Sequence, residues 1–231
     1  MEVATALKRA ESSRQVLESA VVRFAGDSGD GMQLTGGRFT LATALAGNDL
    51  ATFPDFPAEI RAPAGTTFGV SAFQINFGAR EIKTSGDVLD VLVAMNPAAL
   101  KVNLTDVKSG GLIIVDTGTF TEKNLRKAGY GADPLVDGSL DRFRVHQIDM
   151  SRLTLDALKD TGLTKKEAQR CKNMWALGLV YWIFGRDRQA TVDWLARKFA
   201  RRPEVAKGTI AALNAGHAFG ETAEISSEIG A

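Results

Sequence analysis

The sequence is poor in the residues that most often hold metals. Its 231 residues include a single cysteine, Cys171, and two histidines, His146 and His217. One cysteine cannot form a disulfide within the chain, and an iron–sulfur cluster normally requires about four thiolates. Structural zinc sites draw several cysteines and histidines together at short spacing, a pattern that these three residues do not form. We therefore expect neither a disulfide nor a metal centre held by this chain alone.

Charge imbalance and long apolar runs are also missing. Lys and Arg number 28 against 27 for Asp and Glu, so a net charge of +1 gives no general attraction to nucleic acid or to an anionic membrane. The longest apolar run, Met174 to Phe184, is well short of the roughly 18 residues that span a bilayer. The N-terminus carries acids and bases where a signal peptide has an apolar core. We expect a cytoplasmic protein without nucleic-acid or membrane partners, which must bind any anion locally.

Strand and helix patterns alternate along the chain. Short apolar runs typical of strands covered on both faces occur in Val88–Ala94 and Leu112–Val115, and apolar residues alternate with polar ones between Phe68 and Phe77. Further strands are expected at 21–25, 50–53 and 142–148, and helices at 31–46, from Pro97, and at 165–184, 188–201 and 203–219. This order predicts an α/β fold with a mostly parallel, doubly wound Rossmann-like sheet, helices on both faces and a helical C-terminal part.

The pattern also predicts three segments. Residues 1–20 are helical in pattern but too polar for a core, so they are expected to form a peripheral helix. Residues 21–219 are expected to form the α/β domain. Residues 220–231 have no apolar period, and they are expected to be a linker or the start of a truncated continuation.

A glycine-rich turn follows the first predicted strand, in VVRFAGDSGDGMQLTGGRF (21–39). In a parallel sheet this turn is the usual phosphate site, because glycines let the backbone approach a ligand and the next helix points unpaired N–H groups at it. From the turn alone, a second interpretation is equally good: Gly26, Gly29 and Gly31 simply permit a tight strand-to-helix connection.

Spacing separates the turn from three known nucleotide motifs. Its glycines run G-x-x-G-x-G, the wrong order for the dinucleotide fingerprint G-x-G-x-x-G, which leaves NAD as a weak candidate with Asp55 as ribose acid. A P-loop needs a lysine at the helix start, and none lies between Arg9 and Lys83. The segment GDG is similar to the opening of a thiamine diphosphate motif, but the chain has no adjacent asparagines to complete one.

Five segments in register carry a family resemblance: AGDSGDGMQLTGGRF, FPDFPAEIRAPAGTTFGVSAFQI, DVLVAMNPAAL, GGLIIVDTG and RCKNMWALG. Together they resemble the gamma domain of 2-oxoacid:ferredoxin oxidoreductases, over roughly Val21 to Gly216. FPAEIR following GDSGDG most resembles the 2-oxoglutarate branch, in which the gamma domain is fused N-terminal to the alpha region.

The resemblance implies a part of a multisubunit enzyme. Such an enzyme decarboxylates a 2-oxoacid on thiamine diphosphate, passes electrons through iron–sulfur clusters to ferredoxin, and captures the acyl group on coenzyme A. It places thiamine diphosphate, Mg and the 4Fe–4S clusters in alpha and beta partner parts, which also reach ferredoxin. For the gamma domain it implies a share of the coenzyme A site, no catalytic residue, and assembly into a hetero-oligomer.

Seven residues are the candidate coenzyme A contacts. Five belong to the turn: Ser28, Gly29, Asp30, Gly31 and Met32. Arg61 offers a guanidinium fork for phosphate after a proline-rich loop, and Asn173 offers an amide at the start of an apolar helix. Asp30 repels a phosphate, so its carboxylate is expected either to cap the following helix or to face a partner. A nucleotide-binding module for NAD or a mononucleotide, and a purely structural interface subunit, remain alternatives.

Overall fold

The computed structural model describes residues 15–16, 18–59, 61–223 and 229–230. Most of the predicted peripheral helix, residues 1–20, lies outside the described part of the chain. The residues of this segment that the structure describes are not helical. Gln15–Val16 forms β1, and Ser19 already belongs to β2 (Ser19–Asp27). The helix prediction is wrong there because these residues pair with other strands: β1 with β8 (Ile229–Gly230) and the start of β2 with β4 (Val70–Gly78).

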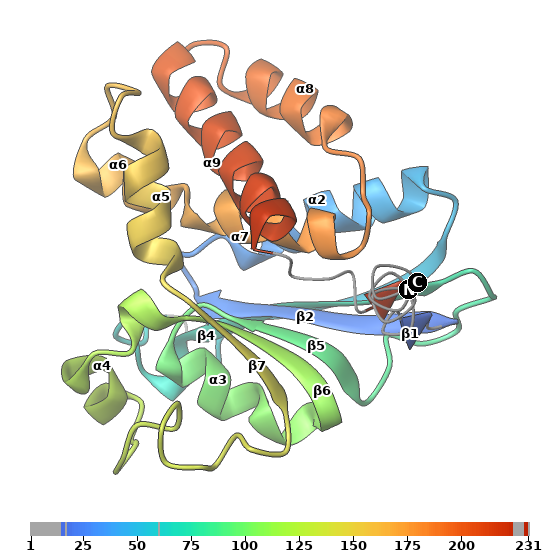
Figure 1. Ribbon diagram of the computed structural model, residues 1–231, viewed down its shortest axis with the longest axis vertical. Coiled ribbons are helices and arrows are strands. Elements are labelled where there is room, and N and C mark those ends of the chain that lie inside the picture. The colour runs from blue at the N-terminus through green and yellow to red at the C-terminus, as the bar shows by residue number, and fades with distance from the viewer. Residues whose placement is uncertain (1–14, 17, 60, 224–228, 231) are drawn as a thin grey trace, which may run out of the picture.

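A six-stranded sheet forms the centre of the fold, in the order β3-β4-β2-β5-β6-β7 (Figure 1). The remaining strands are β3 (Asp49–Asp55), β5 (Leu89–Ala94), β6 (Val107–Asp116) and β7 (Arg144–Ile148). β2, β5, β6 and β7 pair in parallel, whereas β4 is antiparallel to both of its neighbours, β2 and β3. The prediction of a mostly parallel α/β sheet is confirmed, with β4 as the exception.

Helices cover both faces of this sheet (Figure 1). One face carries α2 (Met32–Leu45), α5 (Met150–Leu158), α7 (Lys172–Ile183), α8 (Gln189–Lys198) and α9 (Pro203–Thr222). The other carries α3 (Pro97–Asn103) and α4 (Glu122–Lys127). Alternate strand residues enter two separate cores: Val22 and Phe24 pack toward α2 and α7, and Val21 and Ala25 toward α3. Burial on both faces is why the central strands are continuous apolar runs.

Three single-turn helices complete the connections: η1 (Thr67–Gly69), η2 (Leu104–Asp106) and η3 (Thr117–Thr119). None of the described helices is both long and apolar enough to cross a membrane. At the C-terminal end α9 runs to Thr222, so Gly220 to Thr222 are helical where a linker was expected. Residues 224–228 lie outside the described part.

The predicted single helix over 165–184 is divided at Cys171. It forms α6 (Lys165–Arg170) and α7, with Cys171 between them. At the start of α7, the Asn173 Oδ1 accepts the backbone N–H of Met174 at 2.9 Å, a local bond of the kind that competes with regular helix. The break gives α7 an N-terminal turn of its own, which lies at the candidate site.

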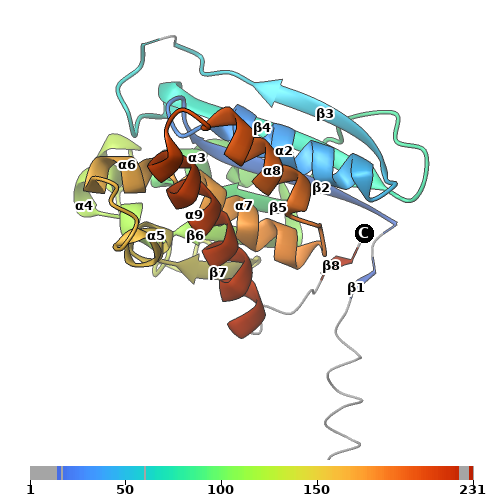
Figure 2. The same cartoon turned by 90° about the horizontal axis from the view of Figure 1, so that it is seen from above.

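Helix α7 is buried on nearly every side, and α9 crosses directly over it (Figure 2). Two glycines permit this approach. A Cβ added at Gly178 of α7 would lie 1.9 Å from the Leu213 carbonyl oxygen, and one added at Gly216 of α9 would lie 1.8 Å from that of Trp175. Glycine at both positions therefore lets the two helices pack in backbone contact.

Gly216→Ala should therefore destabilise the fold. The added methyl group must displace helix backbone rather than a flexible side chain, so we expect the free energy of unfolding to fall by at least about 1–3 kcal/mol in urea denaturation. Gly37→Ala in α2 is the matched control, because a Cβ there meets nothing within 4 Å. It should leave stability unchanged or raise it by about 0.5–1 kcal/mol. Equal stability of the two variants would contradict the close contact.

Candidate functional site

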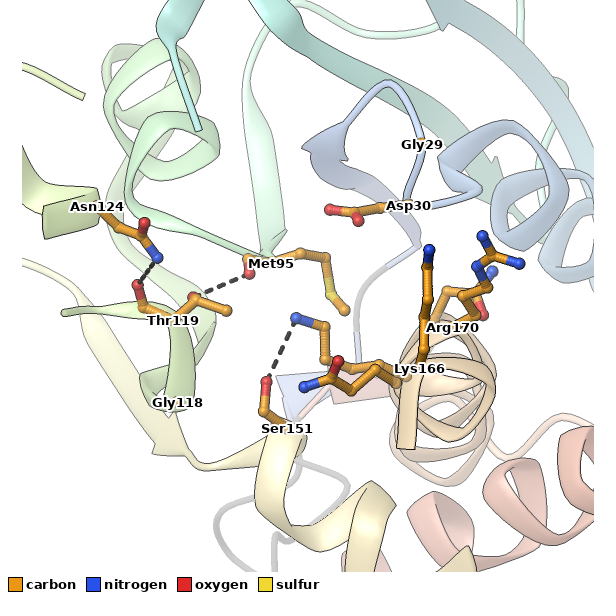
Figure 3. A pocket seen from close by; sticks show the side chains of 12 residues that line it. Gly29, Asp30, Met95, Gly118, Thr119, Asn124, Ser151, Lys166 and Arg170 are labelled. Atoms are coloured by element: carbon orange, nitrogen blue, oxygen red, sulfur yellow. Dashed lines mark hydrogen bonds between the residues drawn. The ribbon is translucent and has the colours of Figure 1, made fainter. Parts of the chain in front are cut away.

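The carboxyl ends of β2, β5, β6 and β7 meet at one edge of the sheet, where a cavity of about 400 Å³ opens beside α6 (Figure 3). Its wall comes from the turn after β2, the residues that follow β5 and β6, and the starts of α5 and α7. The lining residues are Gly29, Asp30, Met95, Gly118, Thr119, Asn124, Ser151, Lys166, Gln169, Arg170, Lys172 and Asn173. Ligands of open parallel sheets bind at this edge.

The protein's own packing explains two of the three glycines in the turn after β2. A Cβ at Gly26 would lie 2.9 Å from the Asp30 Oδ2, and Gly31 has a φ of 76° and would meet the Asn173 Nδ2 at 2.6 Å. Gly29 differs, because a Cβ there meets nothing within 4 Å, although the residue lines the cavity. The left-handed backbone at Gly31 therefore favours glycine, a Cβ at Gly26 would have to displace the Asp30 carboxylate, and Gly29 faces free space.

Asp30 braces the turn and does not cap the helix. Its Oδ2 accepts the backbone N–H of Asp27 at 2.9 Å, while the N-cap of α2 is Gly31, with no side-chain hydrogen bond. The prediction of a helix cap is thus wrong, and the carboxylate forms part of the cavity wall (Figure 3). Burial raises the pKa of Asp30, an effect that Lys172 partly offsets and that the nearby Asp27 and Asp116 carboxylates reinforce.

A buried ion pair lies beneath the cavity. The Lys172 Nζ donates to the Asp116 Oδ2 at 2.7 Å, and Asp116 is fully buried. Asp116 also accepts the Ser151 hydroxyl at 2.7 Å, the Ser151 N–H at 3.0 Å and the Gly118 N–H at 3.2 Å. None of Asp116, Lys172 and Ser151 is among the seven sequence-based candidates. Lys172 immediately precedes Asn173 in RCKNMWALG. Ser151 was missed because α5 was not predicted, although Asp149 as N-cap and the helical spacing of the apolar residues after it mark this helix.

Lys166 and Arg170 bring further positive charge to the cavity. They are four residues apart on α6, and Figure 3 shows both side chains extending from that helix toward the Gly29 turn. Neither has an ion pair within the described part of the chain, and like charges at this spacing cost a helix about 0.2–0.5 kcal/mol. The intervening acid, Glu167, is engaged elsewhere: it pairs with Arg202 at 2.9 Å and closes the capping box of Thr164. The two cations are therefore available to an anion.

The candidate residues do not all meet at this cavity. Gly29, Asp30 and Asn173 line it, and Gly31 lies against Asn173. Three candidates lie elsewhere. The Met32 side chain is in the core, so only its backbone N–H can face a ligand. Ser28 is exposed and does not line the cavity. Arg61 is exposed as well, and it lines neither this cavity nor the adjoining one.

The adjoining cavity, of about 190 Å³, extends the site toward the loop before β4. It shares Asp30, Thr119 and Lys172 with the first cavity and adds Gly65 and Lys127 among others. The Asp27 carboxylate accepts the Gly65 N–H at 3.0 Å, which fastens this loop to the glycine-rich turn. The two cavities adjoin along these shared residues and together form one cleft.

Metal and thiol chemistry are not suggested by the described residues. Within them, no group of three His, Cys, Asp or Glu side chains is placed to hold a metal ion. Burial raises the pKa of the Cys171 thiol, so this residue stays protonated at neutral pH, as expected of a small core residue. The chemistry that the site offers is anion binding by cations and backbone N–H groups.

The raised pKa of Asp30 predicts how its replacement changes stability with pH. The pKa of Asp30 is higher in the folded protein than in the unfolded chain, where it is near 4. The ionised carboxylate therefore destabilises the fold, and this cost appears as pH rises from the unfolded-state pKa through the folded-state pKa. Asp30→Asn should therefore unfold at higher urea concentration than the parent at pH 7, with the difference shrinking toward pH 4. Asp160→Asn, which alters an exposed carboxylate, is the control. A difference that grows as pH falls would contradict the assignment.

Comparisons with known proteins agree on one family. Residues 21–219 match the model of the pyruvate ferredoxin/flavodoxin oxidoreductase family. The chain is 55% identical over 215 residues to the 2-oxoglutarate oxidoreductase subunit KorA of Mycobacterium tuberculosis, which covers 93% of this chain and 33% of KorA.

Solved structures show the same fold. A 2-oxoglutarate:ferredoxin oxidoreductase from Magnetococcus marinus, with 2-oxoglutarate, coenzyme A and succinyl-CoA bound, matches 89% of this chain and 32% of its own at a TM-score of 0.67 and 25% identity. Two smaller proteins match nearly end to end. These are the pyruvate oxidoreductase subunit PORC of Thermotoga maritima (TM-score 0.56, 17% identity, 87% of this chain and 97% of that one) and a keto/oxoacid ferredoxin oxidoreductase gamma subunit of Geobacter sulfurreducens (0.54, 19%, 86% and 99%).

The chain thus spans about a third of the length of two relatives and nearly all of two gamma-type subunits. The family model covers most of its residues, and the sequence identity to KorA extends over the same region. This protein belongs to the pyruvate ferredoxin/flavodoxin oxidoreductase family.

Proposed function

We propose that this chain is the gamma part of a 2-oxoglutarate:ferredoxin oxidoreductase and that its carboxyl-edge cavity binds the diphosphate of coenzyme A. The observation that carries the proposal is the pair of uncompensated cations, Lys166 and Arg170, facing the Gly29 turn across that cavity. The similarity to KorA supports the choice of 2-oxoglutarate, and the coenzyme A bound in the Magnetococcus enzyme supports the choice of ligand.

The residues present fit a diphosphate. Lys166 and Arg170 supply charge-assisted hydrogen bonds, and the backbone of the Gly29 turn supplies N–H donors at the start of α2. Lys172 is already committed to Asp116, so its role is to balance the charge of the wall and offset that of Asp30. Asn173 holds its amide against Gly31 and fixes the turn. Arg61 is proposed as an outer contact, for a part of coenzyme A that extends beyond the cleft.

Bond making and breaking belong to partner parts in this proposal. Thiamine diphosphate, bound with Mg by the alpha and beta parts, would supply the decarboxylation chemistry, and 4Fe–4S clusters there would pass electrons to ferredoxin. The present chain binds and orients coenzyme A so that its thiol is delivered to the acyl group. Its positively charged cavity raises the affinity for the phosphates without taking part in the reaction.

Removing either cation should weaken coenzyme A binding specifically. In the enzyme assembled with its partners, Lys166→Gln and Arg170→Gln should each raise the apparent KM for coenzyme A about tenfold, the effect of losing roughly 1.4 kcal/mol of a charge-assisted bond. The KM for 2-oxoglutarate should not change. Lys165→Gln is the matched control, because it removes the same charge from an exposed neighbour on α6 that does not line the cavity. If all three variants raise the KM for coenzyme A equally, the effect comes from the overall charge of the protein and not from this cavity. If none of them raises it, the proposed site is wrong.

Gly29→Ala provides a test that does not depend on charge. The protein leaves space for this methyl group, so the urea denaturation midpoint should stay that of the parent, whereas the KM for coenzyme A should rise because the methyl group occupies the space left for the ligand. Gly37→Ala, with equally free space but outside the cavity, should leave this KM unaltered. An unchanged KM in Gly29→Ala would show that the ligand does not approach this turn.

A further inference from the structure

An acidic side chain, Asp30, lies in the wall of the carboxyl-edge cavity, where the proposed ligand is itself an anion. It lines the adjoining cavity as well, so a molecule that occupies the cleft passes beside its carboxyl group. Figure 3 shows this group pointing into the space between the lining residues. A carboxylate and a phosphate in contact repel one another, most strongly where water is partly excluded. Anion binding therefore requires that the charge of Asp30 be neutralised when the ligand is bound.

Cations lie around the cleft, but they are not paired with Asp30. Lys172, at the start of α7, donates at 2.7 Å to the carboxylate that ends β6. Lys166 and Arg170 line the first cavity from α6, and Lys127 lines the adjoining one from α4, where its Nζ donates to a backbone carbonyl. In the described part of the chain none of these side chains forms an ion pair with Asp30. The protein's own cations therefore leave its charge uncancelled.

The surroundings of Asp30 favour its neutral form. Burial raises the pKa of Asp30 and Lys172 partly offsets this, while the charges of Asp27 at the end of β2 and Asp116 at the end of β6 raise it further. Its Oδ2 accepts the Asp27 N–H at 2.9 Å, and its Oδ1 accepts no hydrogen bond from the described residues. Among these residues no three His, Cys, Asp or Glu side chains are placed to hold a metal ion. A proton is thus the neutralising charge that the site can supply.

We propose that Asp30 binds the diphosphate as a neutral carboxylic acid, which takes one proton from solvent and donates it in a hydrogen bond from Oδ1 to a phosphate oxygen. This inference rests on the proposed function, and it names the group that makes coenzyme A binding depend on pH. A disubstituted diphosphate stays ionised at neutral pH, so the carboxyl group is the partner that takes the proton. Two acids in contact share a proton for the same reason. Oδ2 keeps the Asp27 N–H in both states, so the turn retains its shape.

Binding should therefore take up a proton, which calorimetry of the parent enzyme can measure. The enzyme assembled with its partners, without 2-oxoglutarate, is titrated with dephospho-coenzyme A in buffers of different ionisation enthalpy. This ligand keeps the diphosphate but lacks the 3′-phosphate, which would itself titrate near about pH 6. Between about pH 5.5 and about pH 8, proton uptake should reach roughly one per site at its maximum, and affinity should fall by up to about tenfold per pH unit. Absence of uptake across this range would overturn the proposal.

Asp30→Asn provides the comparison, because its amide is neutral at every pH and can donate the same hydrogen bond. This variant should bind dephospho-coenzyme A without proton uptake and with an affinity that does not change with pH. Asp160→Asn, which alters an exposed carboxylate outside the cleft, should behave as the parent. Equal uptake by the parent and Asp30→Asn, or binding by Asp30→Asn that is tighter than the parent's by the same factor at every pH, would contradict the assignment. Lys166→Gln would still raise the KM for coenzyme A in that case, because it tests the site and not the proton.

Discussion

The buried pair of Asp116 and Lys172 is the interaction on which the candidate site depends. Asp116 ends β6, and its carboxylate joins the η3 turn, the start of α5 and the start of α7 through four hydrogen bonds. An isolated charge at this depth would cost several kcal/mol, so the lysine and the N–H donors must be held in place together. The pair therefore fixes α7 to the sheet edge, and with it Asn173, which lies against the glycine-rich turn.

Close packing of the helical layer supports this arrangement from behind. Gly178 and Gly216 let α7 and α9 approach until their backbones nearly touch, so α7 has little freedom to slide relative to α9. The break at Cys171 then turns α6 away from α7 and places Lys166 and Arg170 over the cavity. Rigid packing on one side and uncompensated charge on the other are what a pre-organised anion site requires.

Local sequence patterns predicted the central fold well and its margins poorly. β5 and β6 were evident because strands buried on both faces must be apolar throughout, and α2 and α9 because helix and turn signals agree there. The helix expected near Ser19 was wrong because pairing with β4 overrides local propensity. The division at Cys171 escaped prediction because the apolar period continues unbroken across it. Helix α5 was missed although Met150, Leu153 and Leu158 recur at helical spacing.

The sequence by itself determined the family, the βα alternation and the position of a glycine-rich turn at a sheet edge, because each of these depends on short stretches of neighbouring residues. Only the tertiary structure decided what surrounds that turn. Lys166, Arg170 and Lys172 lie more than a hundred residues from Gly29 in the chain. They reach it because α7 packs against α2, the helix that follows the turn, and α6 packs against α7. It also decided that Asp30 braces the turn and that, of Gly26, Gly29 and Gly31, Gly29 is the one that faces free space, since these depend on atoms brought together by folding.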